Sequence, residues 1–350
     1  MSTITVIGTT TWGKTLCVVF ARSGLDVRLW ARTEREAKNL SGKRDNNPEI
    51  PGGEVPERLY ITSDIEKATD GTEAVVLAVP SHSMRDNIRT VRNILDRKML
   101  VISAAKGFEP VSNKRMSQVI AEEISADLQP NICIISGPNL SREIARNWPA
   151  ATVLAASSED VAERARRMLT GPGFCVYTNT DIIGVELGGA LKNIIALGAG
   201  MIDGLGFGDN TRAAFITRGL TEIAALGVAL GANPLTFSGL AGLGDLIATC
   251  TSSLSRNHYV GYELAKGRPL DDITASMNAV AEGINTARSA MELSRKLSLG
   301  MPVTERIYQV LFNGASPEKV VSEVVPFEAK HELDGENWKL FSFTNHPNHD

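Results

Sequence analysis

Lys192 stands in a segment whose composition favours acid–base chemistry. Residues 184–193 read Gly-Val-Glu-Leu-Gly-Gly-Ala-Leu-Lys-Asn, so this lysine lies on an alanine- and glycine-rich helix whose neighbours are too small to crowd a substrate. A lysine packed into a small, apolar segment loses hydration, which lowers its pKa toward the range where it can give and take a proton. An isolated lysine is more often a surface residue of an amphipathic helix. The rest of the chain must decide between these two interpretations.

A glycine-containing turn near the N-terminus fits two different phosphate-binding patterns. Residues 8–15 read Gly-Thr-Thr-Thr-Trp-Gly-Lys-Thr, which is literally a Walker A string, with Lys14 and Thr15 as phosphate and magnesium ligands. A P-loop enzyme also needs an acidic residue after another buried strand, and the sequence offers none. The alternative is a dinucleotide-binding turn in which Gly8 and Gly13 are in place and Thr10 replaces the middle glycine. In that case Thr10 either displaces the coenzyme slightly outward or donates its hydroxyl to it.

The end of the second apolar run indicates which dinucleotide would bind. An NAD-binding fold carries an acidic residue there, against the ribose hydroxyl, whereas this chain reads Leu-Trp-Ala-Arg-Thr at residues 29–33. The guanidinium of Arg32 is planar and always charged, which suits a 2′-phosphate. NADP is therefore the preferred coenzyme, with NAD as the second choice, unless Arg32 is simply an exposed loop residue.

The pattern of apolar residues predicts two domains and a tail. Up to about residue 178, short apolar runs alternate with longer periodic stretches, which predicts a parallel sheet flanked by helices. Beyond about residue 181, alanine, leucine and glycine recur at helical spacing. The expected fold is α/β, with a Rossmann-like dinucleotide-binding domain at residues 1–182, an all-helical substrate and catalytic domain at 183–327 and a variable tail at 328–350.

Composition excludes several classes of function. The 350 residues carry a formal net charge of −4, which gives no reason to expect nucleic acid or an anionic membrane as partner. There is no N-terminal basic region and no uninterrupted apolar run of membrane-spanning length. The four cysteines are far apart without metal-ligand spacing, and no histidine is needed as a metal ligand. We expect a cytoplasmic protein without a metal site or membrane insertion, and the apolar helices of the second half make a homodimer plausible.

Several sequence blocks, in one order, resemble a known family. The most specific are residues 184–193, Gly239-Leu-Ala-Gly-Leu-Gly-Asp-Leu246 and Thr249-Cys-Thr-Ser-Ser-Leu-Ser-Arg-Asn257. Supporting blocks are Ala78-Val-Pro-Ser81, Ala105-Lys-Gly107, Ser136-Gly-Pro138 and Asp209-Asn-Thr-Arg-Ala213. Over residues 3–325 the chain resembles the NAD(P)-dependent glycerol-3-phosphate dehydrogenases of bacterial and archaeal type. It departs from the family's pattern at Thr10, usually glycine, and at residues 139–141, where Asn-Leu-Ser replaces Ser or Thr followed by Phe-Ala.

The resemblance implies an activity and three catalytic residues. The reaction interconverts dihydroxyacetone phosphate and sn-glycerol 3-phosphate with a nicotinamide coenzyme and supplies glycerol phosphate for phospholipid synthesis. By similarity, Lys192 is the proton donor and acceptor and Lys106 is a second cation at the same oxygen. Two adjacent ammonium groups disfavour each other's charge, so one could be neutral near pH 7. Asp245 would orient or partly neutralise the pair, unless it serves only as a helix N-cap.

The resemblance also implies the residues that hold the substrate and the coenzyme. An arginine beside hydroxyl and amide donors makes a strong anion cradle, so consecutive residues 255–257 would bind the substrate's phosphate. Trp12 could instead be a packing aromatic and Glu282 a solvated acid. The predicted substrate-binding residues are Lys106, Gly137, Asn139, Lys192, Asp245, Ser255, Arg256 and Asn257. The predicted coenzyme-binding residues are Gly8, Thr11, Trp12, Gly13, Arg32, Lys106, Ser141, Arg256, Val280 and Glu282.

Besides a P-loop hydrolase, the sequence leaves two other functions open. One is a related two-domain reductase of another small hydroxy acid or ketone, for which the predicted cradle at residues 255–257 would have no obvious purpose. The other is a non-catalytic NADPH-binding sensor in which Thr10 has weakened turnover. A P-loop hydrolase is the least favoured, because the acidic partner is missing from the sequence.

Overall fold

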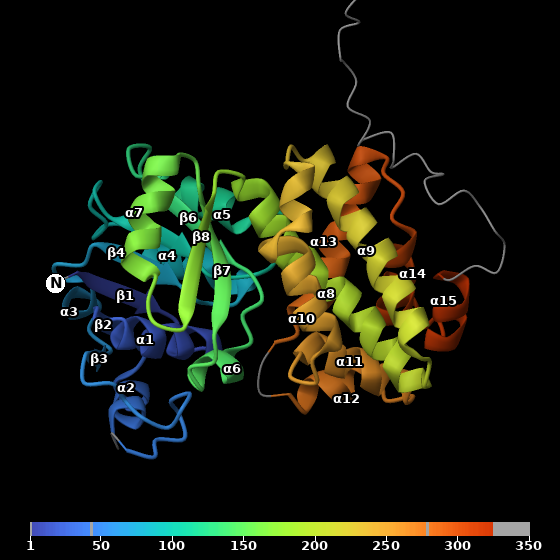
Figure 1. The fold of residues 1–350 in the computed structure, drawn as a ribbon, viewed down its shortest axis with the longest axis horizontal. Helices are drawn as coiled ribbons and strands as arrows, with labels where there is room; N and C mark the ends of the chain where they lie inside the picture. The colour runs from blue at the N-terminus through green and yellow to red at the C-terminus, as the bar shows by residue number, and fades with distance from the viewer. Residues whose placement is uncertain (1, 43–44, 278–279, 325–350) are drawn as a thin grey trace, which may run out of the picture.

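A computed structural model describes residues 2–42, 45–277 and 280–324. Figure 1 shows a domain built on a β-sheet next to a domain built only of helices. The first helix of the second domain begins at Ile182. The tail predicted at residues 328–350 lies outside the described residues. The expected fold class, a Rossmann-like domain followed by a helical domain, is confirmed.

One eight-stranded sheet forms the centre of the first domain, in the order β3-β2-β1-β4-β5-β6-β7-β8. Strands β4, β5 and β6 are buried along their whole length, as expected for central strands covered by helices on both faces. The strands are β1 (Thr3–Ile7), β2 (Asp26–Trp30), β3 (Leu59–Thr62), β4 (Ala74–Leu77), β5 (Leu100–Ser103), β6 (Ile132–Ser136), β7 (Ala150–Ala156) and β8 (Phe174–Asn179).

The sheet is not parallel throughout, contrary to the sequence prediction. Strands β1 to β6 are all parallel to one another. Strand β7 runs antiparallel to β6, and β8 is parallel to β7. The connection from β6 to β7 contains only the five-residue helix α6 (Ser141–Ala145), which contacts α1 (Thr11–Arg22). The chain thus re-enters the sheet from the edge at which it left, without a crossover, so β7 runs back.

Because β1, β2, β4, β5 and β6 are parallel, the residues that follow them meet at one edge of the sheet. This carboxyl edge is where doubly wound folds bind their ligands. The other helices of this domain are α2 (Glu34–Ser41), α3 (Ile65–Thr69), η1 (Ser81–Ser83), α4 (Met84–Val91), α5 (Met116–Glu123), η2 (Gln129–Asn131) and α7 (Glu159–Leu169).

Helix α8 (Ile182–Leu205) is the core of the second domain and contacts α9, α10, α11, α13, α14 and α15. Within the described part of the chain, it is the one helix long and apolar enough to span a bilayer, and 89% of its most apolar window is buried inside the protein. Its apolar length is therefore explained by its place in the core. The remaining elements are α9 (Asp209–Ala229), η3 (Pro234–Ser238), η4 (Leu240–Gly244), α10 (Asp245–Thr251), α11 (Arg256–Ala265), α12 (Leu270–Ala275), α13 (Glu282–Leu297), α14 (Pro302–Asn313) and α15 (Pro317–Val324).

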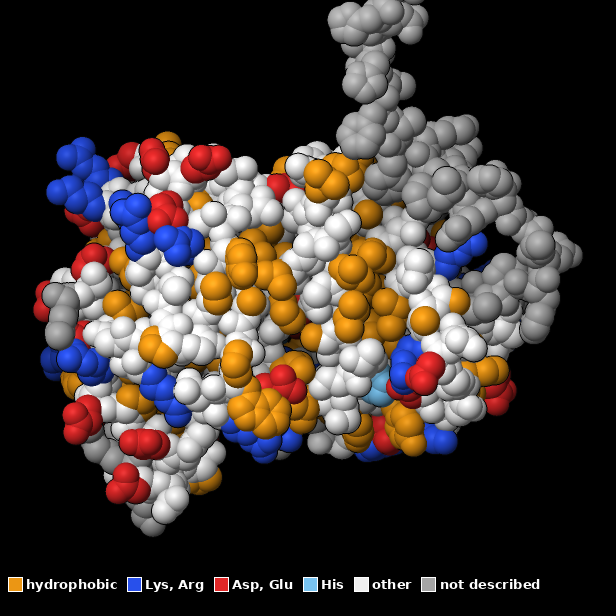
Figure 2. Space-filling view, in the orientation of Figure 1, with side chains coloured by type: hydrophobic (Ala, Val, Ile, Leu, Met, Phe, Trp, Pro, Cys, Tyr) orange, Lys and Arg blue, Asp and Glu red, His pale blue; other side chains and the backbone are white. Residues whose placement is uncertain are grey.

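The two domains exchange side chains where they meet. Phe108, which follows β5, is buried in the hydrophobic core of the helical domain. Val185 and Ala241 of the helical domain are buried in a core of the sheet domain. Hydrophobic side chains also gather on both sides of this boundary on the face drawn in Figure 2. Apolar burial at the boundary therefore joins the two domains into one packed body.

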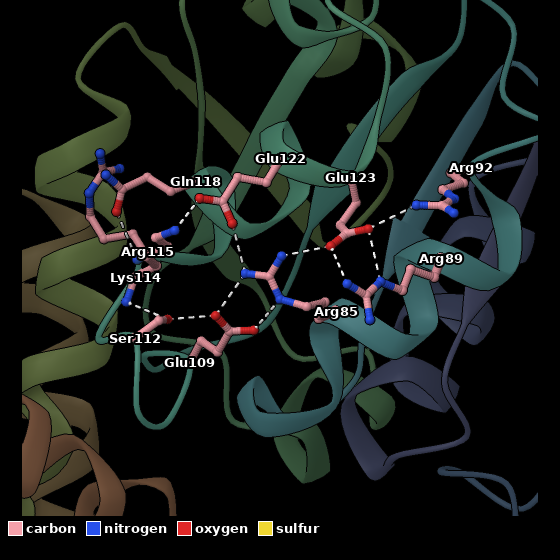
Figure 3. A network of polar contacts seen from close by, with 10 residues as sticks. All are labelled: Arg85, Arg89, Arg92, Glu109, Ser112, Lys114, Arg115, Gln118, Glu122 and Glu123. Atoms are coloured by element: carbon pink, nitrogen blue, oxygen red, sulfur yellow. Dashed lines mark hydrogen bonds and ion pairs between the residues drawn. The ribbon is translucent and has the colours of Figure 1, made fainter.

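A network of ion pairs fastens the loop that follows β5. Arg85 on α4 forms ion pairs with Glu109 in this loop and with Glu122 and Glu123 on α5 (Figure 3). Glu123 also forms ion pairs with Arg89 and Arg92. The side chain of Glu123 is only 6% exposed, so these arginines neutralise a nearly buried charge. The network holds the segment that begins with residue 106 against α4 and α5.

Candidate active site

Lys192 is buried at the boundary between the two domains, 5% exposed. Its Nζ donates to Thr249 Oγ1 at 2.5 Å and forms an ion pair with Asp245 Oδ1, both from α10. Burial lowers the pKa of Lys192 to about 8, while the charge of Asp245 opposes this shift and that of Lys106 adds to it. The surface-lysine interpretation is therefore wrong, and Lys192 can both give and take a proton near neutral pH.

Lys106 reaches the same carboxylate from the other domain. It follows β5, and its Nζ donates to Asp245 Oδ2 at 2.6 Å and to the carbonyl oxygen of Gly137 at 2.9 Å. Asp245, 1% exposed, thus binds one lysine on each oxygen. The N-cap alternative for Asp245 is wrong, because its side chain is committed to the lysines and Gly244 stands at the cap position of α10. The carboxylate holds two amines together that would otherwise repel.

Gly137 and Asn139 follow β6 beside this centre. A Cβ at Gly137, where φ is +150°, would lie 3.1 Å from the Cα of Thr152, so the turn requires glycine. The Nδ2 of Asn139 donates to Thr152 Oγ1 at 2.9 Å, and its Oδ1 is buried without a hydrogen-bond partner among the described residues. Asn139 is thus anchored to β7, and one acceptor atom remains for a ligand.

The predicted anion cradle forms the start of α11, but its three residues have different roles. Ser255 caps the helix by accepting from the amide of His258, and Asn257 Oδ1 accepts from the amide of Gly283 on α13. Arg256 is exposed, and no hydrogen bond or ion pair engages its side chain within the described ranges. The guanidinium of Arg256 is therefore the group most available to an incoming anion.

The turn after β1 has the geometry of a dinucleotide site. A Cβ on Gly8 would lie 2.5 Å from the carbonyl oxygen of Ala78, and one on Gly13 would lie 2.1 Å from that of Gly8. Thr10 caps α1: its hydroxyl accepts from the amide of Gly13 at 3.0 Å and donates to Ala78 O at 2.8 Å. The idea that Thr10 donates its hydroxyl to the coenzyme is therefore wrong, since that proton is already bound.

The side chains on α1 also decide against a P-loop. Lys14 pairs with Glu49 at 3.5 Å, and the buried hydroxyl of Thr15 donates to the carbonyl oxygen of Thr11 at 2.8 Å. Neither side chain is available in the way that a Walker A loop requires. Thr11 is exposed, whereas Trp12 packs partly against the domain core, as its alternative interpretation stated.

The remaining predicted coenzyme residues lie around this edge. Arg32 is exposed after β2, and its side chain has no partner among the residues described. Glu282, the first residue of α13, is not a freely solvated acid: it accepts from Ser81 N at 3.0 Å and Ser81 Oγ at 2.6 Å across the domain boundary. Ser141 begins α6, and Val280 is exposed.

The glycines of the turn after β1 and the exposed guanidinium of Arg32 fit a nicotinamide dinucleotide. Gly8 leaves room for close backbone approach, and the amides at the start of α1 offer the partial positive charge that binds pyrophosphate. Within the described ranges, no group of three or more His, Cys, Asp or Glu side chains is arranged to hold a metal ion.

Comparison with known proteins gives the same assignment along the chain. The family model described as NAD-dependent glycerol-3-phosphate dehydrogenase N-terminus matches residues 3–162, and the C-terminus model matches residues 181–322. The chain belongs to this dehydrogenase family. Glycerol-3-phosphate dehydrogenase [NAD(P)+] of Dehalococcoides mccartyi is 58% identical over 97% of this chain and 95% of its own length. The counterpart of Geobacillus thermodenitrificans is 43% identical over 95% and 97%.

A solved structure confirms the likeness in three dimensions. Glycerol-3-phosphate dehydrogenase of Coxiella burnetii has a TM-score of 0.86 and 34% identity, covering 93% of this chain and 98% of its own. The resemblance inferred from the sequence blocks is therefore confirmed.

Three residues near the site, Thr249, Ser81 and Glu36, were not predicted from the sequence. Thr249 lies one helical turn after Asp245 and so shares its face, a signal that was present in the sequence. Ser81 ended a quoted block, but nothing in the sequence linked it to Glu282. Glu36 returns to the end of β2, where its Oε2 accepts from the amide of Arg32 at 3.0 Å. The acid that an NAD-binding fold carries directly after β2 is absent from residues 31–33, and Glu36 supplies one from the first turn of the next helix.

Proposed function

We propose that this chain interconverts dihydroxyacetone phosphate and sn-glycerol 3-phosphate with NADP, or less favourably NAD, and supplies glycerol phosphate for phospholipid synthesis. The observation that carries the proposal is the carboxylate of Asp245, shared by Lys192 and Lys106 from two domains. The family membership and the NAD(P)+ dependence stated in the relatives' names support it.

The reaction needs a proton to move on one oxygen while hydride moves on the adjoining carbon. The bound coenzyme supplies or accepts the hydride. In the oxidative direction, neutral Lys192 takes the hydroxyl proton, which its lowered pKa of about 8 permits. Lys106 stabilises negative charge on the same oxygen, and Asp245 keeps both amines in place. In the reductive direction, protonated Lys192 returns the proton to the carbonyl oxygen.

Arg256 would hold the distal phosphate. An exposed guanidinium that makes no hydrogen bond or ion pair in the described ranges suits bidentate phosphate binding, although the charge of Glu282 acts on it from α13. The start of α11 adds favourable helix polarity. A reductase of an uncharged ketone would have no use for this cation, so Arg256 favours the phosphorylated substrate over the related-reductase alternative.

The test is a rate comparison with purified protein. Dihydroxyacetone phosphate and either NADPH or NADH are supplied, and coenzyme oxidation is followed by absorbance. Steady oxidation with either coenzyme, faster with NADPH, is expected. Coenzyme binding without turnover would favour a sensor, and turnover with unphosphorylated dihydroxyacetone at the same kcat/KM would favour another reductase.

We also propose a cytoplasmic location, a small phosphorylated substrate as the main partner and a homodimer. The net charge of −4 and the burial of α8 support a protein that inserts into no membrane and binds no nucleic acid. Sedimentation equilibrium tests the dimer, and a mass equal to one chain over the working range of concentrations would contradict it.

A further inference from the structure

Two side chains of opposite charge stand at the end of β2. Arg32 is exposed, and the carboxylate of Glu36 lies directly against the amide of the same residue. Glu36 Oε1 also accepts from Thr9 Oγ1 at 2.5 Å, and Thr9 follows Gly8 in the turn after β1. The carboxylate therefore joins the turn that binds the pyrophosphate in this fold class to the loop that binds the adenosine ribose.

These contacts differ from those of an ordinary capping residue. Glu36 occupies the third position of α2, and its amide donates to the N-cap Thr33 Oγ1 at 3.2 Å. A capping box would return the Glu36 carboxylate to the amide of Thr33. Here it reaches one residue further, to Arg32, and across to Thr9. An ionised carboxylate has about four acceptor positions, so about two remain for a ligand.

The chemistry of the two possible coenzymes separates the roles of the two side chains. NAD carries a 2′-hydroxyl on its adenosine ribose, which an acid beside β2 accepts, whereas NADP carries a 2′-phosphate there, which an arginine binds. A site for one coenzyme needs only one of these two groups. This chain presents both, on adjacent turns of one loop and helix.

We propose that Glu36 is a coenzyme-selecting residue that accepts the 2′-hydroxyl of NAD and repels the 2′-phosphate of NADP, opposing the preference set by Arg32. The inference rests on the proposed function, since it takes the site to hold a nicotinamide dinucleotide. It makes the preference for NADP a balance between two charges, and either charge can be removed by a single substitution.

Glu36→Gln is the most informative variant because the amide can keep both contacts. Its Oε1 can accept from the Arg32 amide while its Nε2 donates to Thr9 Oγ1, which accepts as well as it donates. Only the charge is lost. Glu34→Gln is the matched control, because it removes an equal charge from the first turn of the same helix, where Glu34 pairs with Lys38 and Ser63.

The measurement is calorimetric binding without substrate. The ligands are NADP+ and NAD+, and then adenosine 2′,5′-bisphosphate and adenosine 5′-monophosphate, which differ only at the 2′ position. In Glu36→Gln we expect affinity for both 2′-phosphorylated ligands to rise roughly fivefold, and affinity for the 2′-hydroxyl ligands to fall. The gain should shrink at high salt. Glu34→Gln should change each affinity less than twofold, and Arg32→Gln should weaken only the 2′-phosphorylated ligands.

The outcomes separate the inference from the function beneath it. If Glu36→Gln shifts all four affinities by the same factor, or shifts none, Glu36 only supports the loop and the inference is overturned. A melting temperature equal to that of the native protein verifies that Glu36→Gln folds. If the melting temperature is lower, Glu36→Asp is measured instead, because it keeps the charge on a shorter side chain. Glu36→Asp must lower the affinity for the 2′-hydroxyl ligands without raising the affinity for the 2′-phosphorylated ligands. If the native protein binds neither NADP+ nor NAD+, the proposed function itself fails.

Discussion

At the scale of single residues, the central feature of the site is one buried carboxylate, Asp245, that forms ion pairs with two lysines. Asp245 is shared by Lys192, which is almost wholly buried, and by Lys106, whose side chain is 18% exposed. Desolvation acts most strongly on the buried amine and lowers its pKa, so Lys192 is the one suited to exchange a proton. Lys106 reaches the same carboxylate from the sheet domain, where its ammonium group can stabilise an alkoxide.

Lys192→Ala should greatly lower the rate of the chemical step. Removing the proton acceptor should lower kcat by roughly 10²–10⁴-fold, because the group is needed in the transition state. The dissociation constant for NADPH, measured by fluorescence titration, should change little. Losses of equal size in coenzyme affinity and in kcat would contradict the assigned role.

The pH dependence of the oxidative reaction should report the titration of Lys192. Its rate requires the neutral amine, so kcat should rise with pH with a midpoint near the pKa of about 8, and the reductive rate should fall over the same interval. Asp245 raises the pKa of Lys192, so Asp245→Asn should move the oxidative midpoint to lower pH. The exposed Asp271→Asn variant serves as control and should leave the midpoint in place. A midpoint that stays unchanged in Asp245→Asn would rule out Lys192 as the titrating group.

At the scale of elements, α8 packs through its glycines. A Cβ on Gly261 of α11 would lie 1.8 Å from the carbonyl oxygen of Leu197, and one on Gly200 of α8 would lie 2.0 Å from that of His258. Backbone atoms cannot move aside as flexible side chains do. The close crossing of α8 and α11 therefore depends on glycine from both helices, and it fixes Arg256 relative to Lys192.

Gly261→Ala should destabilise the protein by about 1–3 kcal/mol, as expected for overpacking, despite alanine's better helix propensity. Urea unfolding measures the change. Gly300→Ala is the control, since its Cβ would meet no atom within 4 Å. Equal stability of the two variants would mean that the helices separate easily at this crossing.

The network around Glu123 should make stability depend on acid pH. Hydrogen bonds from Arg89, and also from Arg85, lower the pKa of Glu123 from its ordinary 4.5 to about 2, against the opposing effect of burial. For a carboxylate with a lowered pKa, the contribution to stability is complete above pH 4.5 and is lost as pH falls toward 2.

Glu123→Gln should therefore cost about 1–2 kcal/mol at pH 7, where partly exposed partners moderate the effect, and progressively less below pH 4.5. Chemical unfolding at pH 7, 5 and 3 provides the comparison. Glu57→Gln, which removes an exposed carboxylate that lies outside the network, should change stability little at any of these values. A constant difference for Glu123→Gln across the three pH values would show that ionisation is not involved.

At the scale of the whole molecule, the proposed catalytic centre requires both domains, because each contributes one of its two lysines. Lys106 comes from the sheet domain and Lys192 from the helical domain, and the contacts of Glu282 with Ser81 cross the same boundary. The contacts between Ser81 and Glu282 join η1, at the carboxyl edge of the sheet, to the first residue of α13. They fix the relative placement of residues that both domains contribute.

Ser81→Ala removes one of the two hydrogen bonds to Glu282 and keeps the backbone one. We expect the KM values for coenzyme and for substrate to rise together by a few-fold, with kcat changed less, because the side chains that react are untouched. Ser83→Ala is the control, because it removes a hydroxyl of the same short helix that donates to the carbonyl oxygen of Pro80 and does not contact Glu282 in the described structure. A change confined to kcat would argue that Ser81 acts in the chemical step instead.

Much of this arrangement could be predicted from local sequence. Small neighbours around Lys192 indicated its burial, and the resemblance of several sequence blocks to a known family brought Lys106 and Gly137 into the predicted site. What escaped prediction depends on contacts between distant segments. The reversal of β7 follows from how α6 packs, the hydroxyl of Thr10 is captured by Ala78, and Glu36 folds back from the next helix. Sequence spacing alone does not encode these pairings.

The strand order sets a length that a ligand must match. Strands β1 and β4 separate β2, which carries Arg32, from β5, which leads to Lys106. Three interstrand intervals amount to roughly 14 Å. A molecule that touches both corners must therefore be elongated, with a recognised tail at one end and a reactive head at the other. The sheet thus fixes the distance between the two ends of a bound ligand. Substitutions near the end of β2 can change which ligand end is accepted there without moving Lys106 and Lys192 at the other end.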